Sequence, residues 1–101
     1  MVVYDVRFAK DVEADLRTLK VYHRRRVLDA IESQLRREPR APTRNRKILV
    51  NLIPPWNAEP PIWELRVGDY RVFYDVSDKE TVVYVRAVRK KPPGRTTGEI
   101  V

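Results

Sequence analysis

The feature that most constrains the fold is a pair of alternating segments joined by the dipeptide Gly68-Asp69. Residues 62–67 and 70–76 each carry apolar side chains at every second position, which is the period of a half-buried β-strand. A two-residue Gly-Asp link between such segments indicates a tight hairpin, because glycine accepts a positive φ. A third alternating segment, 81–88, follows the polar residues 77–80. The C-terminal half therefore predicts three consecutive antiparallel strands.

The N-terminal half changes from the strand period to the helical one. Residues 2–8 alternate and predict a strand, and two apolar stripes with helical spacing follow: Ala9, Val12, Leu16 and Leu19, then Val27, Leu28, Ile31 and Leu35. The second helix is expected over about residues 22–37, because Pro39 removes residue 38 from the helical region. After a loop at 39–46, the apolar run 48–53 predicts another strand. The prolines on both sides of Trp56 predict a connection, for which a packed loop is favoured over a partner contact.

This order of elements predicts an α+β fold. It consists of an N-terminal strand, a helical hairpin, and a four-stranded, mostly antiparallel sheet with the helices on one face. A length of 101 residues suits one domain. We expect that domain to span residues 1–91 and the proline- and glycine-containing tail, residues 92–101, to be irregular. The sheet face away from the helices is expected to stay open and to offer room for a site.

Composition limits the chemistry that the chain can perform. It contains no cysteine and one histidine, His23, which excludes disulfides and thiolate sites and leaves no basis for a metal or other cofactor. No signal peptide and no apolar run of the roughly 18 residues needed for a membrane span is evident, so we expect a cytoplasmic location without membrane contact. The formal net charge of +7 indicates a polyanionic partner, either nucleic acid or an acidic protein, with solubility alone as the alternative.

Alternation also divides the strand residues between two faces of the predicted sheet. One face is expected to be core: Trp63, Leu65, Val67, Val72, Tyr74, Val76, Val83, Val85 and Ala87. The opposite face collects Glu64, Arg66, Arg71, Phe73, Tyr84 and Arg86, with Arg89, Lys90 and Lys91 at its rim. Arginines bind phosphates and exposed aromatic rings stack on bases, so this face is suited to RNA. Ordinary solvent-facing alternation explains the same pattern equally well.

The hairpin sequence Trp63–Val76, WELRVGDYRVFYDV, resembles the hallmark of the RelE/ParE toxin superfamily, a Leu-Arg, a short turn, a Tyr-Arg and then apolar or aromatic residues. Two further segments agree with the family pattern: the last strand with its basic extension, and the triplet Lys47-Ile48-Leu49. The resemblance covers roughly residues 2–91. It implies a microbial-ribonuclease-like fold and the toxin of a type II toxin–antitoxin system. The implied partner is a cognate antitoxin, whose acidic segment we expect over the basic sheet face or along the helical hairpin. Operator DNA is then reached only through the antitoxin complex.

The resemblance implies an activity as well. RelE-like members cleave mRNA on the ribosome, so we predict a metal-free endoribonuclease that uses the 2′-OH of its substrate and inhibits translation. Arg71 falls on the family's catalytic arginine, Lys91 falls where RelE has a second one, and Glu64 is the candidate base, or equally an ion-pair partner of Arg66 or Arg71. The remaining basic and aromatic residues of the face are expected to bind substrate: Arg66, Arg86, Arg89, Lys90, Phe73 and Tyr84.

The sequence departs from RelE where acid–base groups are expected. Ile62 and Glu64 stand at positions that carry lysines in RelE, Thr97 falls near a later tyrosine, and a C-terminal histidine of some relatives has no counterpart. These departures keep two alternatives open. One is a ParE-like inhibitor of DNA gyrase without nuclease activity, and the other is a decayed toxin that acts only as antitoxin partner and co-repressor.

Overall fold

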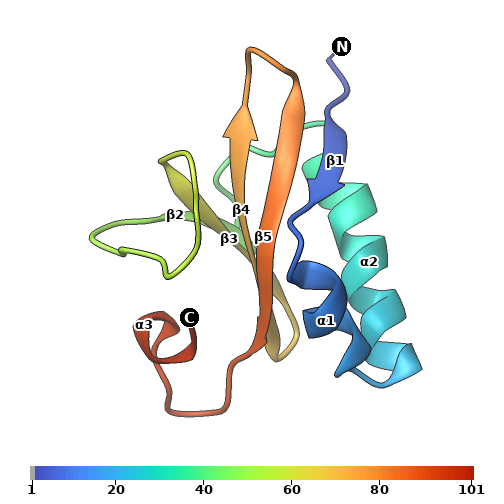
Figure 1. The fold of residues 1–101 in the computed structure, drawn as a ribbon, viewed down its shortest axis with the longest axis vertical. Coiled ribbons are helices and arrows are strands. Elements are labelled where there is room, and N and C mark those ends of the chain that lie inside the picture. The colour runs from blue at the N-terminus through green and yellow to red at the C-terminus, as the bar shows by residue number, and fades with distance from the viewer. Residues whose placement is uncertain (1) are drawn as a thin grey trace.

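The computed structural model describes residues 2–101, and Figure 1 shows the arrangement of its elements. In chain order these are β1 (Asp5–Phe8), α1 (Val12–Arg17), α2 (Val21–Leu35), β2 (Arg46–Leu49), β3 (Ile62–Val67), β4 (Tyr70–Ser77), β5 (Val82–Lys90) and α3 (Thr97–Ile100). The predicted α+β class is confirmed. The sheet has five strands in the order β1-β5-β4-β3-β2, rather than four, because β1 joins it by pairing in parallel with β5.

The hairpin that dominated the sequence joins β3 and β4 as predicted. Val67 pairs with Tyr70 and Gly68 has a φ of 57°, a value that favours glycine. The Arg26 side chain of α2 lies directly against this glycine, and a Cβ there would come within 2.9 Å of its Nη1 atom. The turn therefore needs glycine both for its backbone angle and for the approach of α2.

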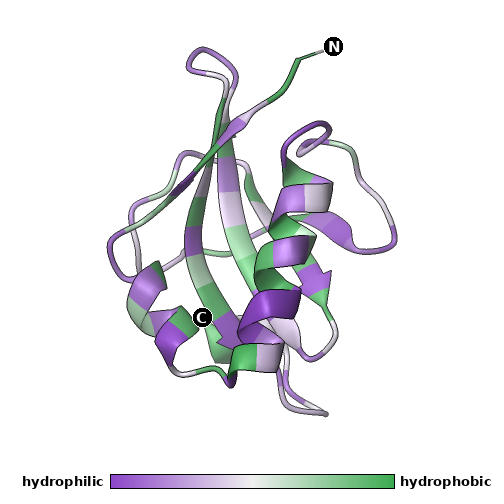
Figure 2. Ribbon diagram, turned by 90° about the vertical axis from the view of Figure 1, so that its right-hand side faces the viewer, coloured by the Kyte–Doolittle hydropathy of each residue, from purple (hydrophilic) through white to green (hydrophobic). Residues whose placement is uncertain are grey.

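The hydrophobic core lies between the helices and one face of the sheet. Val12 of α1 and Val27, Ile31 and Leu35 of α2 are fully buried there. They pack with the sheet residues that alternation assigned to the core, among them Trp63, Leu65, Val72, Tyr74, Val83 and Val85. Each fully buried aliphatic side chain contributes about 1.5–3 kcal/mol to folding. The helices in Figure 2 accordingly show bands of apolar and polar residues, as expected for helices with one buried face.

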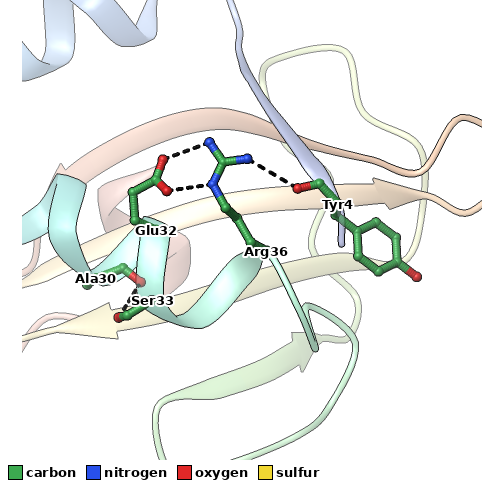
Figure 3. Close-up of polar contacts among 5 residues, drawn as sticks. All are labelled: Tyr4, Ala30, Glu32, Ser33 and Arg36. Atoms are coloured by element: carbon green, nitrogen blue, oxygen red, sulfur yellow. Dashed lines mark hydrogen bonds and ion pairs between the residues drawn. The ribbon is translucent and has the colours of Figure 1, made fainter. Parts of the chain in front are cut away.

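Two arginines fasten the C-terminal end of α2 to the rest of the molecule. Arg36 pairs with Glu32 one turn earlier, at 2.8 Å from Nη2 to Oε1, and its Nη1 donates to the Tyr4 carbonyl at 3.3 Å (Figure 3). Buried Arg46 donates through Nη1 to the carbonyl of Glu38 at 2.8 Å and to that of Gln34. The last carbonyls of a helix lack partners within it, so Arg46 supplies donors that the helix itself cannot.

A bulge in the sheet corrects one face assignment. The register between β4 and β5 shifts between Phe73 and Tyr74, which pair with Ala87 and Val85 and leave Arg86 as the extra residue. Ala87 therefore lies opposite Phe73 on the far face, and Val88 takes the core position beside Val72. Ala87 is buried as predicted, but the prediction that it faces the helices was wrong, since an inserted residue reverses the alternation beyond it.

The sheet face away from α1 and α2 is covered rather than open, which is a second correction. Figure 1 shows the connection after β2 and the C-terminal tail on this side. The Trp56 ring lies over Phe73, with 5.5 Å between ring centroids, and Phe73 and Asp75 are fully buried. The predicted connection around Trp56 is thus a packed loop. Prolines indicate that such a segment is not a strand, but they do not indicate where it lies.

The tail was expected to be irregular, and it contains the single helical turn of α3. A capping box, in which the Thr96 and Glu99 side chains each bond to the other's backbone, begins this turn. Within residues 2–101 no helix has both the length and the apolar character that crossing a membrane requires.

Candidate functional site

A small pocket of about 100 Å³ lies beside the β3–β4 hairpin and is named the Arg71 pocket here. Its lining consists of Arg44, Asn45, Lys47, Glu64, Arg66, Arg71 and Lys91, which are five cations, one carboxylate and one amide. Strand pairing assembles it: Lys47 of β2 lies opposite Glu64 of β3, and Arg66 lies opposite Arg71 of β4. Lys91 is held next to the hairpin because its backbone N–H donates to the Asp69 carbonyl at 2.7 Å.

Glu64 supplies the one carboxylate of this pocket and is only 4% exposed. Its Oε1 lies 3.7 Å from Lys47 Nζ and 3.9 Å from Arg71 Nε. Its Oε2 accepts a hydrogen bond of 2.7 Å from the Thr97 hydroxyl of α3. A buried carboxylate needs such partners to offset its desolvation. Both oxygens of Glu64 are therefore oriented, one toward the pocket cations and one toward the tail.

Arg71 is 7% exposed, and backbone carbonyls fix its guanidinium group. Its Nη1 donates to the carbonyls of Gly68 at 2.8 Å and Tyr70 at 2.9 Å. The hairpin turn thus holds the side chain that the sequence placed at the catalytic position. A cation held in this way needs no rearrangement to meet a developing negative charge, which is the condition for electrostatic preorganisation. The structure brings together Arg71, Glu64, Lys91 and Arg66 as the sequence suggested.

The other predicted substrate-binding residues do not line this pocket, although Phe73 pairs with Glu64 and Arg89 with Arg71 in the strand register. Four of them already have partners and, together with Asp75, form a cluster named the paired end: Phe73, Asp75, Tyr84, Arg86 and Arg89. Arg86 makes two hydrogen bonds to the buried Asp75, at 2.7 and 3.0 Å, which raise the pKa of Arg86. Its guanidinium carbon also lies 4.6 Å from the centroid of the Tyr84 ring. The Tyr84 hydroxyl donates to Glu80 at 3.0 Å, and this bond raises the pKa of Tyr84.

Arg89 and Lys90 also lie outside the Arg71 pocket. Arg89 donates to Asp15 of α1 at 2.7 Å and lies against the Trp56 ring. Lys90 pairs with Tyr70, a core residue, so its side chain starts from the helix-covered face and not from that of Arg71. The predicted substrate-binding set is therefore split, and only Arg66 lines the same pocket as Arg71.

Four residues near Glu64 were not among the predicted site residues. Arg44, Asn45 and Lys47 line the pocket, and Thr97 holds Glu64 from outside its lining. The dense positive charge of residues 36–47 could have indicated Arg44 and Lys47. The pairing register of β2 with β3, which places them at the pocket, could not be predicted from the sequence. In residues 2–101 no group of three or more His, Cys, Asp or Glu side chains is arranged to hold a metal ion.

A comparison with protein families decides where the chain belongs. The family model of the ParE toxin of the parDE type II toxin–antitoxin system matches residues 6–91, most of the chain. The chain belongs to this toxin family. The match includes Glu64, Arg66, Arg71 and Lys91, and it ends before the tail that carries Thr97. A search of curated proteins gave no match of comparable significance.

Solved toxin structures share the fold of this ParE-family chain. It is similar to a structure of the RelBE2 toxin–antitoxin complex from Mycobacterium tuberculosis, with 27% identity, a TM-score of 0.70, and 89% of this chain and 100% of the other covered. An archaeal RelE–RelB complex from Pyrococcus horikoshii gives 29% identity and a TM-score of 0.69 over 94% and 100% of the two chains. The isolated E. coli RelE toxin, at 21% identity, a TM-score of 0.64 and coverage of 93% and 88%, agrees in fold.

Proposed function

We propose that this toxin is an endoribonuclease that cleaves mRNA on the ribosome. The observation that carries the proposal is the Arg71 pocket, where one buried carboxylate lies 3.9 Å from a fixed arginine within a ring of cations. RNA cleavage through the 2′-OH needs this combination, because a proton must leave the nucleophile while charge accumulates on the phosphate.

The six charged residues of the pocket each have a role in the proposed reaction. Glu64 accepts the proton of the substrate 2′-OH while the 2′-oxygen bonds to phosphorus. Arg71 stabilises the negative charge on the phosphorane. The bond between phosphorus and the 5′-oxygen then breaks as Lys91 donates a proton to that oxygen, which leaves a 2′,3′-cyclic phosphate and a 5′-OH. Arg66 binds the neighbouring backbone, and Arg44 and Lys47 raise the positive potential at the entrance.

The partners of this reaction follow from the same charges. Ribosome and mRNA are the proposed targets, in the cytoplasm, and a cognate antitoxin with an acidic segment is the proposed inhibitor. Two similar solved structures are complexes of a RelE toxin with its antitoxin, which supports this partner. Operator DNA is contacted only through the antitoxin complex. Opposite charges across the interface speed such associations, so antitoxin binding is expected to slow as salt increases.

Controlled expression in bacteria tests the proposal, with 5′ ends of cellular mRNAs mapped by primer extension. The wild-type chain is expected to create new 5′ ends inside translated codons, and Arg71→Ala is expected to lose them. Arg25→Ala is the matched control, because it removes one exposed positive charge of α2 outside the Arg71 pocket lining. Cuts that persist in Arg71→Ala, or that are lost equally in Arg25→Ala, would remove Arg71 from the proposed site.

A second candidate function is gyrase inhibition without RNA cleavage. Two observations favour it: the matching family model is that of the parDE toxin, and Arg71 and Glu64 are both more than nine-tenths buried. The same expression experiment separates the candidates, since growth arrest with intact mRNA and relaxed plasmid DNA would indicate gyrase. Absence of any arrest would instead indicate a decayed toxin that serves only as antitoxin partner.

A further inference from the structure

A second pocket adjoins the Arg71 pocket, and the two pockets share three lining cations. It has a volume of about 220 Å³ and is formed by the hairpin turn and the tail: Arg66, Gly68, Asp69, Arg71, Lys91, Pro92, Pro93, Gly94 and Arg95. Arg66, Arg71 and Lys91 line both pockets. The two pockets thus form one continuous basic track with a shared wall, and Arg95 is the cation that only the second pocket has.

The charge of this track exceeds what one phosphodiester would neutralise. Six cations line the two pockets together, namely Arg44, Lys47, Arg66, Arg71, Lys91 and Arg95, against the carboxylates of Glu64 and Asp69. A single phosphodiester carries one negative charge, so it would leave most of this excess unpaired. Neighbouring like charges repel one another, and the arrangement is stabilised by a ligand with more than one anionic group.

Arg95 is available for such a ligand, because its existing ion pair with Glu99, at 3.1 Å, joins side chains that are 62% and 45% exposed. Exposed pairs of this kind are weak and exchange readily for a stronger anion.

The tail makes the second pocket by folding back onto the sheet. The hydrogen bond from Thr97 to Glu64 anchors α3 beside the Arg71 pocket. The Lys91 backbone bond to Asp69 anchors the start of the tail at the hairpin. Between these two anchors, residues 92–95 form the outer wall of the second pocket. Arg95 is therefore placed by contacts that also position Glu64.

We propose that the second pocket binds the phosphate next to the scissile one. A single RNA strand then crosses the wall of Arg66, Arg71 and Lys91, with Arg95 contacting the adjacent phosphodiester. This inference rests on the proposed endoribonuclease function and adds a binding subsite to it. It assigns the tail a part in holding substrate.

Binding of non-cleavable RNA to the full chain tests the subsite. The probe is a 2′-O-methylated trinucleotide with two phosphodiesters, which lacks the nucleophile and stays intact. Two matched probes each carry one neutral methylphosphonate in place of one phosphodiester. The wild type is expected to bind the doubly charged probe roughly tenfold more tightly than either singly charged probe, because a charge-assisted contact is lost with the charge. Titration by nuclear magnetic resonance measures all three affinities.

The variants assign that difference to the second pocket. Arg95→Gln is expected to abolish the preference of the doubly charged probe over the probe that keeps only the scissile phosphodiester, while binding of that singly charged probe stays unchanged. Thr97→Val is expected to weaken the preference through loss of the tail anchor. Arg25→Ala, the control for net charge, is expected to keep it. The subsite is refuted if Arg95→Gln retains the preference, or if Arg95→Gln and Arg25→Ala weaken binding of all probes equally. Wild-type protein that binds none of the probes would overturn the subsite, whereas the endoribonuclease proposal is tested separately by mRNA cleavage in cells.

Discussion

The Arg71 pocket and the paired end share strand β4 and contain similar kinds of residue, yet they differ in what their charges contact. At the paired end, Arg86 faces Asp75 and Arg89 faces Asp15, so each guanidinium has a carboxylate within 2.7 Å. In the Arg71 pocket, five cations share one carboxylate at 3.7 Å or more. Charges at the paired end hold elements together, whereas the pocket keeps an excess that an external anion can neutralise.

Asp75, the partner of Arg86, lies on β4, and the rest of this difference comes from segments outside the strands. Asp15 lies on α1 and Trp56 on the connection after β2, and both reach the paired end from distant parts of the sequence. At the pocket, the tail contributes the hydroxyl of Thr97 and the cation Arg95 but no carboxylate to the pocket linings. Position on the sheet face therefore did not decide which arginines are available to a ligand. Their carboxylate partners did: Asp75 on the neighbouring strand for Arg86, and Asp15 of α1 for Arg89.

Removal of the central carboxylate of the paired end has the largest expected effect on stability. Asp75→Ala would leave Arg86, whose side chain is 20% exposed, without its two hydrogen bonds. We expect a loss of about 2–4 kcal/mol in the free energy of unfolding, because a buried charge without its partner is strongly unfavourable. Urea denaturation measures it. The double variant Asp75→Val, Arg86→Leu should recover most of the loss, and a double variant as unstable as the single one would contradict a role based on charge.

At the Arg71 pocket, Glu64→Gln is expected to affect activity far more than stability. The amide keeps an acceptor for Thr97 but cannot take a proton from the 2′-OH, so cleavage should fall roughly a hundredfold. Cleavage of a reporter mRNA in a cell-free translation extract measures the rate, and urea denaturation measures the stability. A variant that cleaves at the wild-type rate would show that Glu64 is only an ion-pair partner.

Tyr74→Phe provides a stability change on the opposite side of the sheet. The Tyr74 hydroxyl donates to the Pro39 carbonyl at 2.7 Å in the core, and burial raises the pKa of this phenol. The variant leaves that carbonyl without its donor, which costs about 1–2 kcal/mol. Thermal denaturation should show the loss while the cleavage rate at permissive temperature stays normal. A parallel loss of cleavage would mean that the pocket responds to any loss of stability, and would contradict the separation between residues that stabilise the fold and residues that act on substrate.

The smallest expected effect is a pH dependence of the tail. Hydrogen bonds from the Thr96 backbone and from Arg95 hold the pKa of Glu99 below its ordinary value of 4.5. Because the folded pKa is lowered, the bonds that begin α3 are complete above pH 4.5 and are lost as the pH falls through the lowered pKa. The Thr96 amide resonance should therefore move in an acid titration while amides of β4 stay in place. An unmoved Thr96 resonance would contradict this capping arrangement.

Sequence patterns predicted the elements and most of the core because both depend on local period. Trp63, Leu65, Val72 and Tyr74 point to the helices as alternation requires. Alternation failed at Ala87, since the inserted Arg86 reverses the faces and a bulge leaves no mark in the hydrophobic pattern. The covered face was missed for a similar reason: composition identified the segment around Trp56 as a connection, but its packing on Phe73 depends on tertiary contacts.

The sequence predicted the site residues correctly only where residues that are paired across strands are also close in the sequence. Glu64, Arg66 and Arg71 lie around one hairpin, so alternation placed them together correctly. Lys47 joined them through the register of β2, and Thr97 through the fold of the tail, which no local pattern specifies. Arg86 and Arg89 were assigned to substrate because their carboxylate partners lie 11 and 74 residues away in the chain.

The most direct test of the difference between the two regions compares Arg71→Gln with Arg86→Gln, each measured for unfolding free energy and for mRNA cleavage in cells. If the Arg71 pocket acts on substrate and the paired end acts on the fold, Arg71→Gln should lose cleavage even at a temperature where it remains folded. Arg86→Gln should lose stability and, at a temperature where it remains folded, keep cleavage. Arg71→Gln with full cleavage, or Arg86→Gln that is fully stable and inactive, would contradict the account.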